Sequence, residues 1–220
     1  MQYQTITRKG TGEYVDRKSR FIGEAFPVTS EEEVRLYLEE VRKRTYDARH
    51  HCMAYVLDPL HKKASDDGEP QGTAGHPMLD VLENEGIVNI AAVVTRYFGG
   101  TLLGTGGLVR SYTKAVQDAL ENSEIIERQQ GTEVTLKVDY QSIGKMEYFL
   151  ASYELVPIGK NYGEDVEIKL AVPDDKMKKL REETDRITGG KGKIAAGERI
   201  DFAVYEGTLL TGSGLVCDTE

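Results

Sequence analysis

The spacing of apolar residues along this chain changes between two periods, and these periods predict its helices and strands. Ser30 and Glu33 have the spacing of a capping box, and apolar residues then recur at helical intervals, which predicts a helix that ends at about residue 44. Residues 51–57, HCMAYVL, are apolar on both alternating faces, so we expect a central strand covered on both sides. Residues 87–98, IVNIAAVVTRYF, give the strongest strand pattern in the chain.

A glycine-rich loop follows this strand directly and leads into an amphipathic helix pattern. The sequence RYFGGTLLGTGGLVRSY covers residues 96–112. The order of strand, glycine loop and helix is the geometry in which backbone N–H groups and a helix N-terminus receive a phosphate. The loop lacks the Lys-Ser/Thr of a P-loop and the third glycine of a dinucleotide fingerprint, where Val109 stands instead. Two interpretations remain open: an anion site helped by Arg96 and Arg110, or a tight connection packed against neighbouring strands.

A second loop, SDDGEPQGTAGHP at residues 65–77, carries adjacent aspartates. Asp66 and Asp67 beside Gly68 are typical of turn and cap residues, and their spacing does not fit an EF-hand; the alternative is that they hold magnesium. After this loop, Pro77 suits the first position of a helix.

Neighbouring histidines stand at the start of the predicted central strand. The side chains of His50 and His51 are expected to diverge, because successive residues of a strand point to opposite faces. Two ligands such as His50 and Cys52 fall short of a zinc site, and Cys52 is interpreted as a small buried apolar residue. We therefore expect neither a metal nor another cofactor, and no catalytic residue is assigned.

The pattern changes near the polar stretch IIERQQGTEV, which we interpret as a separator between two domains. Beyond it the sequence predicts strand, helix, two strands, helix and strand, the βαββαβ order of ferredoxin-like domains. The expected domains are residues 1–130 and 131–212, with a loose tail at 213–220.

Charge and composition limit the classes of protein that the chain can belong to. Its 220 residues carry a net charge of −9, which argues against a histone-like or tail-type nucleic-acid binder. Basic residues nevertheless cluster at 8–20 and 42–49, so one positive face remains an alternative to ordinary solvated surface. There is no signal-peptide pattern, no apolar run long enough for a membrane span, and no disulfide framework from Cys52 and Cys217. We expect a cytoplasmic protein.

Four ordered motifs resemble the IMPACT family, whose bacterial branch is named after YigZ and YvyE, and the resemblance extends over essentially the whole chain. The motifs are KSRFIG (18–23), ARHHCMAY (48–55), SDDGEPQGTAGHPML (65–79) and VVTRYFGGTLLGTGGLVRSY (93–112).

The resemblance implies an α+β fold with two domains. It implies an N-terminal domain like the second domain of a small-subunit ribosomal protein and like domain IV of elongation factor G. It also implies a ferredoxin-like C-terminal domain. Eukaryotic members regulate translation by competing for a scaffold that activates an initiation-factor kinase, a partner that does not carry over to bacteria. The resemblance therefore implies a role near translation or RNA, without an established enzymatic activity.

Our leading hypothesis is a protein that binds RNA or a ribosome-associated partner and modulates translation, with no membrane partner and no assigned small-molecule substrate. One alternative is an enzyme or sensor for a small phosphorylated ligand held by the Gly99–Gly107 loop. The other is a protein-interaction module. The residues expected to contact phosphate are Lys18, Arg20, Arg49, His50, Arg96, Gly99, Gly100, Gly104, Gly106, Gly107 and Arg110.

Overall fold

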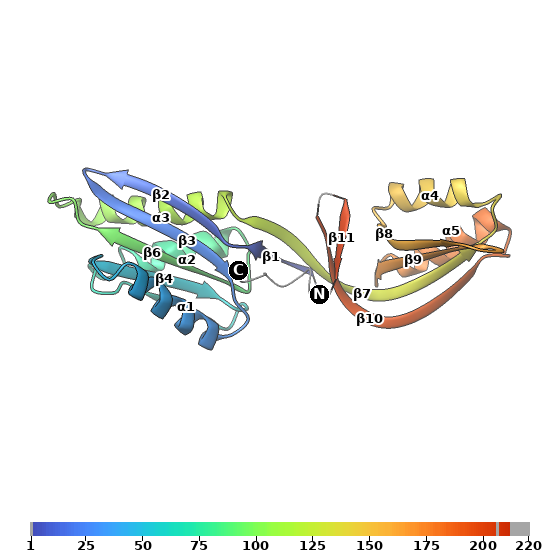
Figure 1. Cartoon of the computed structure of the whole chain (residues 1–220), viewed down its shortest axis with the longest axis horizontal. Helices are drawn as coiled ribbons and strands as arrows, with labels where there is room; N and C mark the ends of the chain where they lie inside the picture. Colours follow the sequence, from blue (N-terminus) through green and yellow to red (C-terminus); the bar gives the residue numbers. More distant parts are fainter. Residues whose placement is uncertain (1, 206, 212–220) are drawn as a thin grey trace. The chain divides into compact units, whose positions relative to one another are not determined.

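The computed structural model describes residues 2–205 and 207–211, which divide into two compact units. The first unit runs from Tyr3 to Ile126 and the second begins at Glu127 (Figure 1). Both are mixed α+β units with antiparallel sheets, as the sequence predicts. The expected tail at 213–220, which includes Cys217, lies outside the described residues. The two expected domain ranges remain a prediction.

The first unit is built on a five-stranded antiparallel sheet in the order β2-β3-β6-β4-β5. β6 lies at its centre and is buried along almost its whole length, because helices cover both faces of the sheet. The strands are β2 (Gly10–Asp16), β3 (Ser19–Pro27), β4 (His50–Val56), β5 (Lys62–Ser65) and β6 (Ile90–Tyr97), while β1 (Gln2–Arg8) pairs with β7 (Glu124–Val138).

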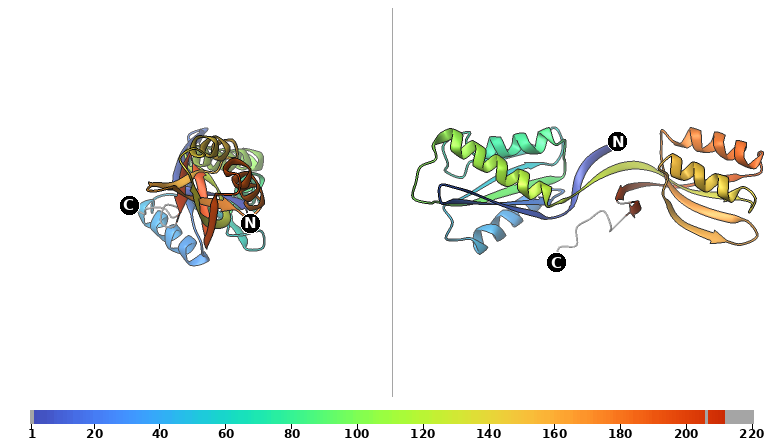
Figure 2. Two further views of the ribbon diagram at one scale, coloured as in Figure 1. Left: turned by 90° about the vertical axis from the view of Figure 1, so that its right-hand side faces the viewer. Right: turned by 90° about the horizontal axis from the view of Figure 1, so that it is seen from above.

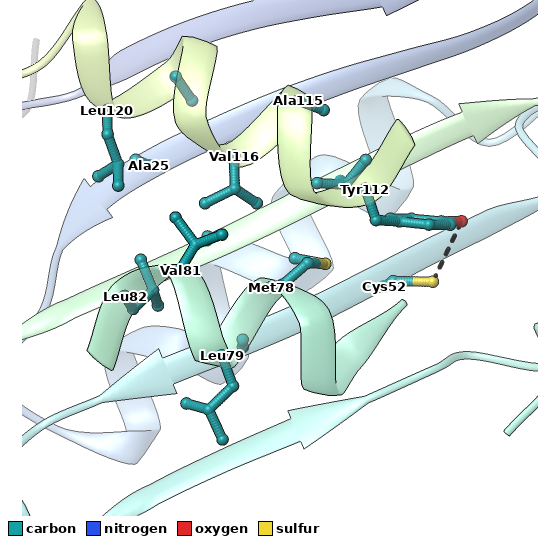
Figure 3. Close-up of a cluster of buried hydrophobic side chains, with 14 of the residues drawn as sticks. Ala25, Cys52, Met78, Leu79, Val81, Leu82, Tyr112, Ala115, Val116 and Leu120 are labelled. Carbon is teal, nitrogen blue, oxygen red and sulfur yellow. Dashed lines mark hydrogen bonds between the residues drawn. The ribbon is translucent and has the colours of Figure 1, made fainter. Parts of the chain in front are cut away.

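One helix covers one face of this sheet and two helices cover the other (Figure 1). α1 (Glu31–Arg44) packs on the first face, whereas α2 (Gly75–Asn84) and α3 (Gly104–Glu121) pack on the second. In Figure 3, side chains of α2 and α3 meet strand residues such as Ala25 and Cys52 in this second core. The predicted cap of α1 is present, since the Ser30 hydroxyl accepts a hydrogen bond from the backbone N–H of Glu33 at 3.3 Å.

The second unit has the element order β7-α4-β8-β9-α5-β10, which is the βαββαβ order that the sequence predicts (Figure 2). A short strand that was not predicted, β11, follows it. Its strands lie in the order β11-β10-β7-β9-β8. Apolar side chains of both helices pack against alternate residues of the strands, so α4 and α5 share one face of the sheet. The remaining elements are α4 (Ile143–Ser152), β8 (Pro157–Tyr162), β9 (Val166–Pro173), α5 (Met177–Thr188), β10 (Lys193–Tyr205) and β11 (Thr208–Thr211).

The polar stretch near residue 130, interpreted from the sequence as a separator between two domains, is part of a strand. It belongs to β7, a single strand of 15 residues, and the division between the two units falls inside this strand. Its polar residues are held in the strand by backbone pairing, for example Gly131 with Ile200 and Arg128 with Ala203 of β10. A ladder of backbone hydrogen bonds does not require apolar side chains, which is why hydrophobic periodicity misses it. Within the described residues, no helix has the length and apolar character needed to cross a membrane.

Candidate functional site

At one end of the first sheet, charged and aromatic side chains lie among buried apolar ones. Backbone pairing places His50 of β4 beside Arg96 of β6, and Arg96 beside Phe21 of β3. Glu69, from the loop between β5 and α2, and Tyr112 of α3 approach this row through hydrogen bonds. We call His50, Cys52, Glu69, Arg96 and Tyr112 the Glu69 cluster.

The carboxylate of Glu69 is the centre of this cluster. Its Oε1 accepts hydrogen bonds from Arg96 Nη1 at 2.5 Å and from the Tyr112 hydroxyl at 2.8 Å, and His50 Nε2 lies 3.9 Å away. Only 8% of Glu69 and 5% of Arg96 is exposed, so water screens this ion pair very little. The guanidinium of Arg96 also lies 5.3 Å from the ring centroid of Phe21, and its Nε has no hydrogen-bond partner within the described chain.

Cys52 and Tyr112 extend the cluster into the apolar core. The Cys52 Sγ lies 3.0 Å from the carbonyl oxygen of Asp66 and 3.3 Å from the Tyr112 hydroxyl, the contact dashed in Figure 3. Burial raises the pKa of the Cys52 thiol to about 12, and burial likewise raises the pKa of Tyr112. Both groups therefore keep their protons at neutral pH, and Cys52 is not a thiolate nucleophile.

The two adjacent aspartates hold the loop that delivers Glu69. Asp66 accepts three backbone N–H bonds of 2.8–3.0 Å from the returning part of its own loop, at Gly72, Ala74 and Gly75. Burial alone would raise the pKa of Asp66, but these three donors outweigh it and the pKa is lowered.

The carboxylate of Asp67 accepts from the backbone N–H of His51 at 2.7 Å and from Arg42 Nη2 at 2.8 Å. Every carboxylate oxygen of the aspartate pair thus already has an N–H donor. The structure gives these aspartates a structural role and no arrangement for the alternative magnesium site; no group of three metal-ligating side chains occurs among the described residues.

The imidazoles of His50 and His51 have different partners, as strand alternation predicts. His50 Nδ1 lies 2.8 Å from the carbonyl oxygen of Asp67, an acceptor that requires Nδ1 to carry the hydrogen. His51 Nε2 lies 2.8 Å from the Thr45 hydroxyl, and burial lowers the pKa of His51. His50 therefore belongs to the Glu69 cluster and His51 does not.

The glycine-rich loop adopts conformations that only glycine accommodates well. Gly100 has φ +83°, and a Cβ on Gly99 would lie 2.1 Å from the backbone carbon of Lys18. This close approach joins the loop to the turn between β2 and β3, where the Ser19 hydroxyl accepts from the Gly99 N–H at 3.1 Å. The later glycines lie in the first turn of α3, with Gly104 at positive φ, Gly106 open to solvent and Gly107 against the Leu103 side chain. Among the residues that the structure describes, no side chain caps α3, and its first turn has no acidic residue, so its first N–H groups remain available to an anion.

The basic residues predicted to contact phosphate fall into two groups. In the first group, Arg96 is buried and paired with Glu69, and Arg20 forms a bidentate ion pair with the two carboxylate oxygens of Glu13, with N–O distances of 2.6 and 2.9 Å. Lys18, Arg49 and Arg110 are exposed and have no ion-pair partner within the described part of the chain.

Each of these three residues lies beside the loop or beside Phe98, which precedes it. The Lys18 backbone touches Gly99, the Arg49 guanidinium lies 5.5 Å from the ring centroid of Phe98, and Arg110 Nη1 lies about 4.0 Å from the position of a Cβ on Gly106. Three segments far apart in the sequence thus bring unpaired positive charge to one loop.

Sequence reasoning did not assign a role to Glu69 or Tyr112. A signal was present, because Arg96 stands in a strand of mostly apolar residues, and a buried guanidinium requires a buried acceptor. Neither periodicity nor spacing identifies that acceptor among the acidic residues of the chain.

Comparisons with known proteins find matches in both units. Residues 17–120 match the family described as Impact N-terminal domain, and residues 136–191 match the family described as Domain of unknown function (DUF1949). The chain is 38% identical to IMPACT family member YvyE of Bacillus subtilis over 89% of this chain and 91% of that protein. It is 37% identical to IMPACT family member YigZ of Escherichia coli, over 83% of this chain and 91% of the relative. A solved structure titled "Crystal structure of an hypothetical protein" aligns with a TM-score of 0.57 at 35% identity, covering 90% of this chain and 98% of the other.

Proposed function

The chain belongs to the IMPACT family, and we propose that its first unit binds phosphate groups of RNA at the glycine-rich loop and thereby modulates translation. The observation that supports this proposal is the set of unpaired cations, Lys18, Arg49 and Arg110, around a loop with available backbone N–H groups. Other arginines of the unit, such as Arg20 and Arg42, are already paired with carboxylates. A local excess of unpaired positive charge on an acidic protein favours a polyanion as ligand.

Residues of the Glu69 cluster have a supporting role in this proposal. Arg96 is too deeply buried to contact a phosphate, so we assign it and His50 to positioning the β6 end from which the loop departs. Gly99 and Gly100 shape the loop, and the first turn of α3 adds N–H donors.

The fold assignments that the family resemblance implies are part of the proposal. We assign the second unit to the ferredoxin-like class, supported by its element order and by the strand order β10-β7-β9-β8 with both helices on one face. For the first unit we retain the resemblance to domain IV of elongation factor G, which favours a ribosome-associated partner in the cytoplasm.

A salt titration tests the phosphate contacts. A labelled mixed-sequence RNA of about 20 nucleotides is titrated with the full chain and with Lys18→Ala, Arg49→Ala and Arg110→Ala. If each cation contacts a phosphate, each variant binds more weakly and the slope of log K against log salt falls by about 0.7. Lys178→Ala is the matched control, because Lys178 is an exposed lysine of α5 with no ion pair within the described chain.

The outcomes separate the competing functions. Unchanged affinity in all three variants removes the loop from the RNA site. Displacement of the RNA by a mononucleotide at low concentration would favour a sensor of small phosphorylated ligands instead. A cell-free translation assay then tests the functional step: the wild-type chain should change the yield and Arg110→Ala should change it less.

A further inference from the structure

Three large apolar side chains are exposed at the same end of the sheet as the unpaired cations. Tyr46 follows α1 and is 84% exposed, Phe98 follows β6 and is 40% exposed, and Leu102 in the glycine-rich loop is 82% exposed. We call these three residues the apolar tip.

Hydrogen bonds join the segments that carry the apolar tip. The Tyr97 hydroxyl donates to Asp47 at 3.3 Å, and the backbone N–H of Arg49 donates to the carbonyl of Arg96 at 3.0 Å. The loop after α1 therefore runs beside the end of β6. Tyr46 and Phe98, each next to one of these bonded residues, come to the same end of the unit.

The ring of Phe98 is held in place by cations and is still partly exposed. The guanidinium carbons of Arg49 and Arg96 lie 5.5 and 5.7 Å from its ring centroid. Cation–π contacts of this kind fix an aromatic ring while leaving other parts of its surface accessible. A positioned aromatic ring beside an unpaired arginine is suited to a ligand with both a flat apolar group and a negative charge.

Among polyanions, this combination distinguishes unpaired from paired nucleic acid. In a duplex the bases stack on each other, so a protein meets mainly phosphates and sugars. In a single strand the base faces are free, and aromatic side chains stack on them. Cations alone would serve both forms, whereas exposed aromatic rings contribute only to the second.

We propose that the apolar tip selects single-stranded RNA, with Phe98 and Tyr46 stacking on unpaired bases while Lys18, Arg49 and Arg110 contact the phosphates. This inference rests on the proposed RNA binding and names its substrate class. The cations supply affinity that depends on salt, and the aromatic rings supply the discrimination against duplex.

The test compares one labelled RNA strand of about 20 nucleotides, chosen to lack internal pairing, with the same strand annealed to its complement. Fluorescence anisotropy with the full chain should show tighter binding of the single strand, by about tenfold. Phe98→Ala and Tyr46→Ala should each weaken single-strand binding about tenfold, the range expected when a base-stacking ring is removed, and leave the salt slope unchanged. Phe98→Trp should keep the preference.

A control variant and the choice of Tyr46→Ala make the result specific. Leu60→Ala is the matched control, because Leu60 is 88% exposed but lies beyond the other end of β4. Tyr46→Ala guards against a folding defect, since the Tyr46 side chain makes no hydrogen bond or ring contact within the described chain, whereas Phe98 contacts two arginines.

The results distinguish this inference from the proposal on which it rests. Equal affinity for strand and duplex, with no loss in Phe98→Ala or Tyr46→Ala, would overturn the inference and leave RNA binding intact. Failure to bind either RNA would overturn both. If the two variants keep full RNA affinity but lose a protein that the wild-type chain retains from ribosomal extracts, the apolar tip contacts protein and the inference is wrong.

Discussion

The ion pair between Glu69 and Arg96 gives a quantitative prediction for the stability of the first unit. Nη1 and Oε1 are 2.5 Å apart. At an effective dielectric constant of about 20, this separation corresponds to an attraction of about 6–7 kcal/mol. Desolvation of two buried charges offsets part of that attraction. Removing one partner leaves the other charge buried and unpaired, so we expect Glu69→Leu to lower the free energy of unfolding by about 3–5 kcal/mol.

A double-mutant cycle separates the pair from the burial of its side chains. In Glu69→Leu the Arg96 guanidinium loses its carboxylate partner, and the Tyr112 hydroxyl loses its acceptor. In Glu69→Leu/Arg96→Leu neither charge remains, so the double variant should be more stable than the sum of the single effects indicates, by at least about 1.5 kcal/mol. Glu69→Gln should fall between wild type and Glu69→Leu, because an amide oxygen still accepts a hydrogen bond.

The measurement must follow the first unit separately, since a chain of two units need not unfold in one step. Urea unfolding read by hydrogen–deuterium exchange of peptides from β4 and β6 meets this requirement. Peptides from β9 serve as the internal control and should keep their protection in every variant. Additive effects of the two substitutions, or a loss below about 1 kcal/mol in Glu69→Leu, would refute the assignment of a buried charged pair.

Three further predictions concern other parts of the chain. Since the folded-state pKa of Asp66 is lowered, the stability that its carboxylate contributes is complete above the unfolded pKa of about 3.9 and is lost as pH falls through the folded pKa. Asp66→Asn should therefore lower the free energy of unfolding in urea by about 1.5–3 kcal/mol at pH 7 and by clearly less at pH 3. An equal loss at both pH values would contradict this prediction. Gly99→Ala should lower the melting temperature, because the new Cβ would collide with the backbone of Lys18. Gly106→Ala should leave the melting temperature unchanged or raise it, because Gly106 lies in a helix and a Cβ there would meet no close neighbour. A fragment of residues 131–211 should unfold cooperatively by circular dichroism because its core lies between Val134 and Ile194, and a non-cooperative transition would show that it needs the first half of β7.

The sequence predicted those helices and strands whose burial gives the apolar residues a regular spacing along the chain. α1 has its cap and its apolar stripe, and β6 is a continuous apolar run because helices cover both of its faces. β1 and β2 were not predicted, since their half-exposed residues carry no such run. That the polar first half of β7 is a strand was not predicted for the same reason, because backbone pairing keeps it in the sheet without an apolar pattern.

The candidate site was predicted only in part, since motifs identify residues but not their partners. The sequence singled out the glycine-rich loop and basic residues; of these, Lys18, Arg49 and Arg110 lie next to the loop or to Phe98 before it, and their contact with phosphate stays a prediction. Arg96 forms its ion pair with Glu69, 27 positions away, because the loop after β5 folds back on Asp66. Such long-range pairing has no local period, so hydrophobic patterns cannot reveal it.

The ion pair between Arg96 and Glu69 separates the residues that stabilise this unit from those proposed to bind a ligand. Arg96 directly precedes the glycine-rich loop in sequence, yet its charge is balanced by Glu69 inside the core. The charge that remains for a ligand lies on exposed side chains of a turn, a loop and a helix surface, at Lys18, Arg49 and Arg110. Surface substitutions of this kind change stability little, whereas those in a buried ion pair change it strongly. The fold of this end can therefore stay constant while the exposed cations, and with them the affinity for a phosphate ligand, vary independently.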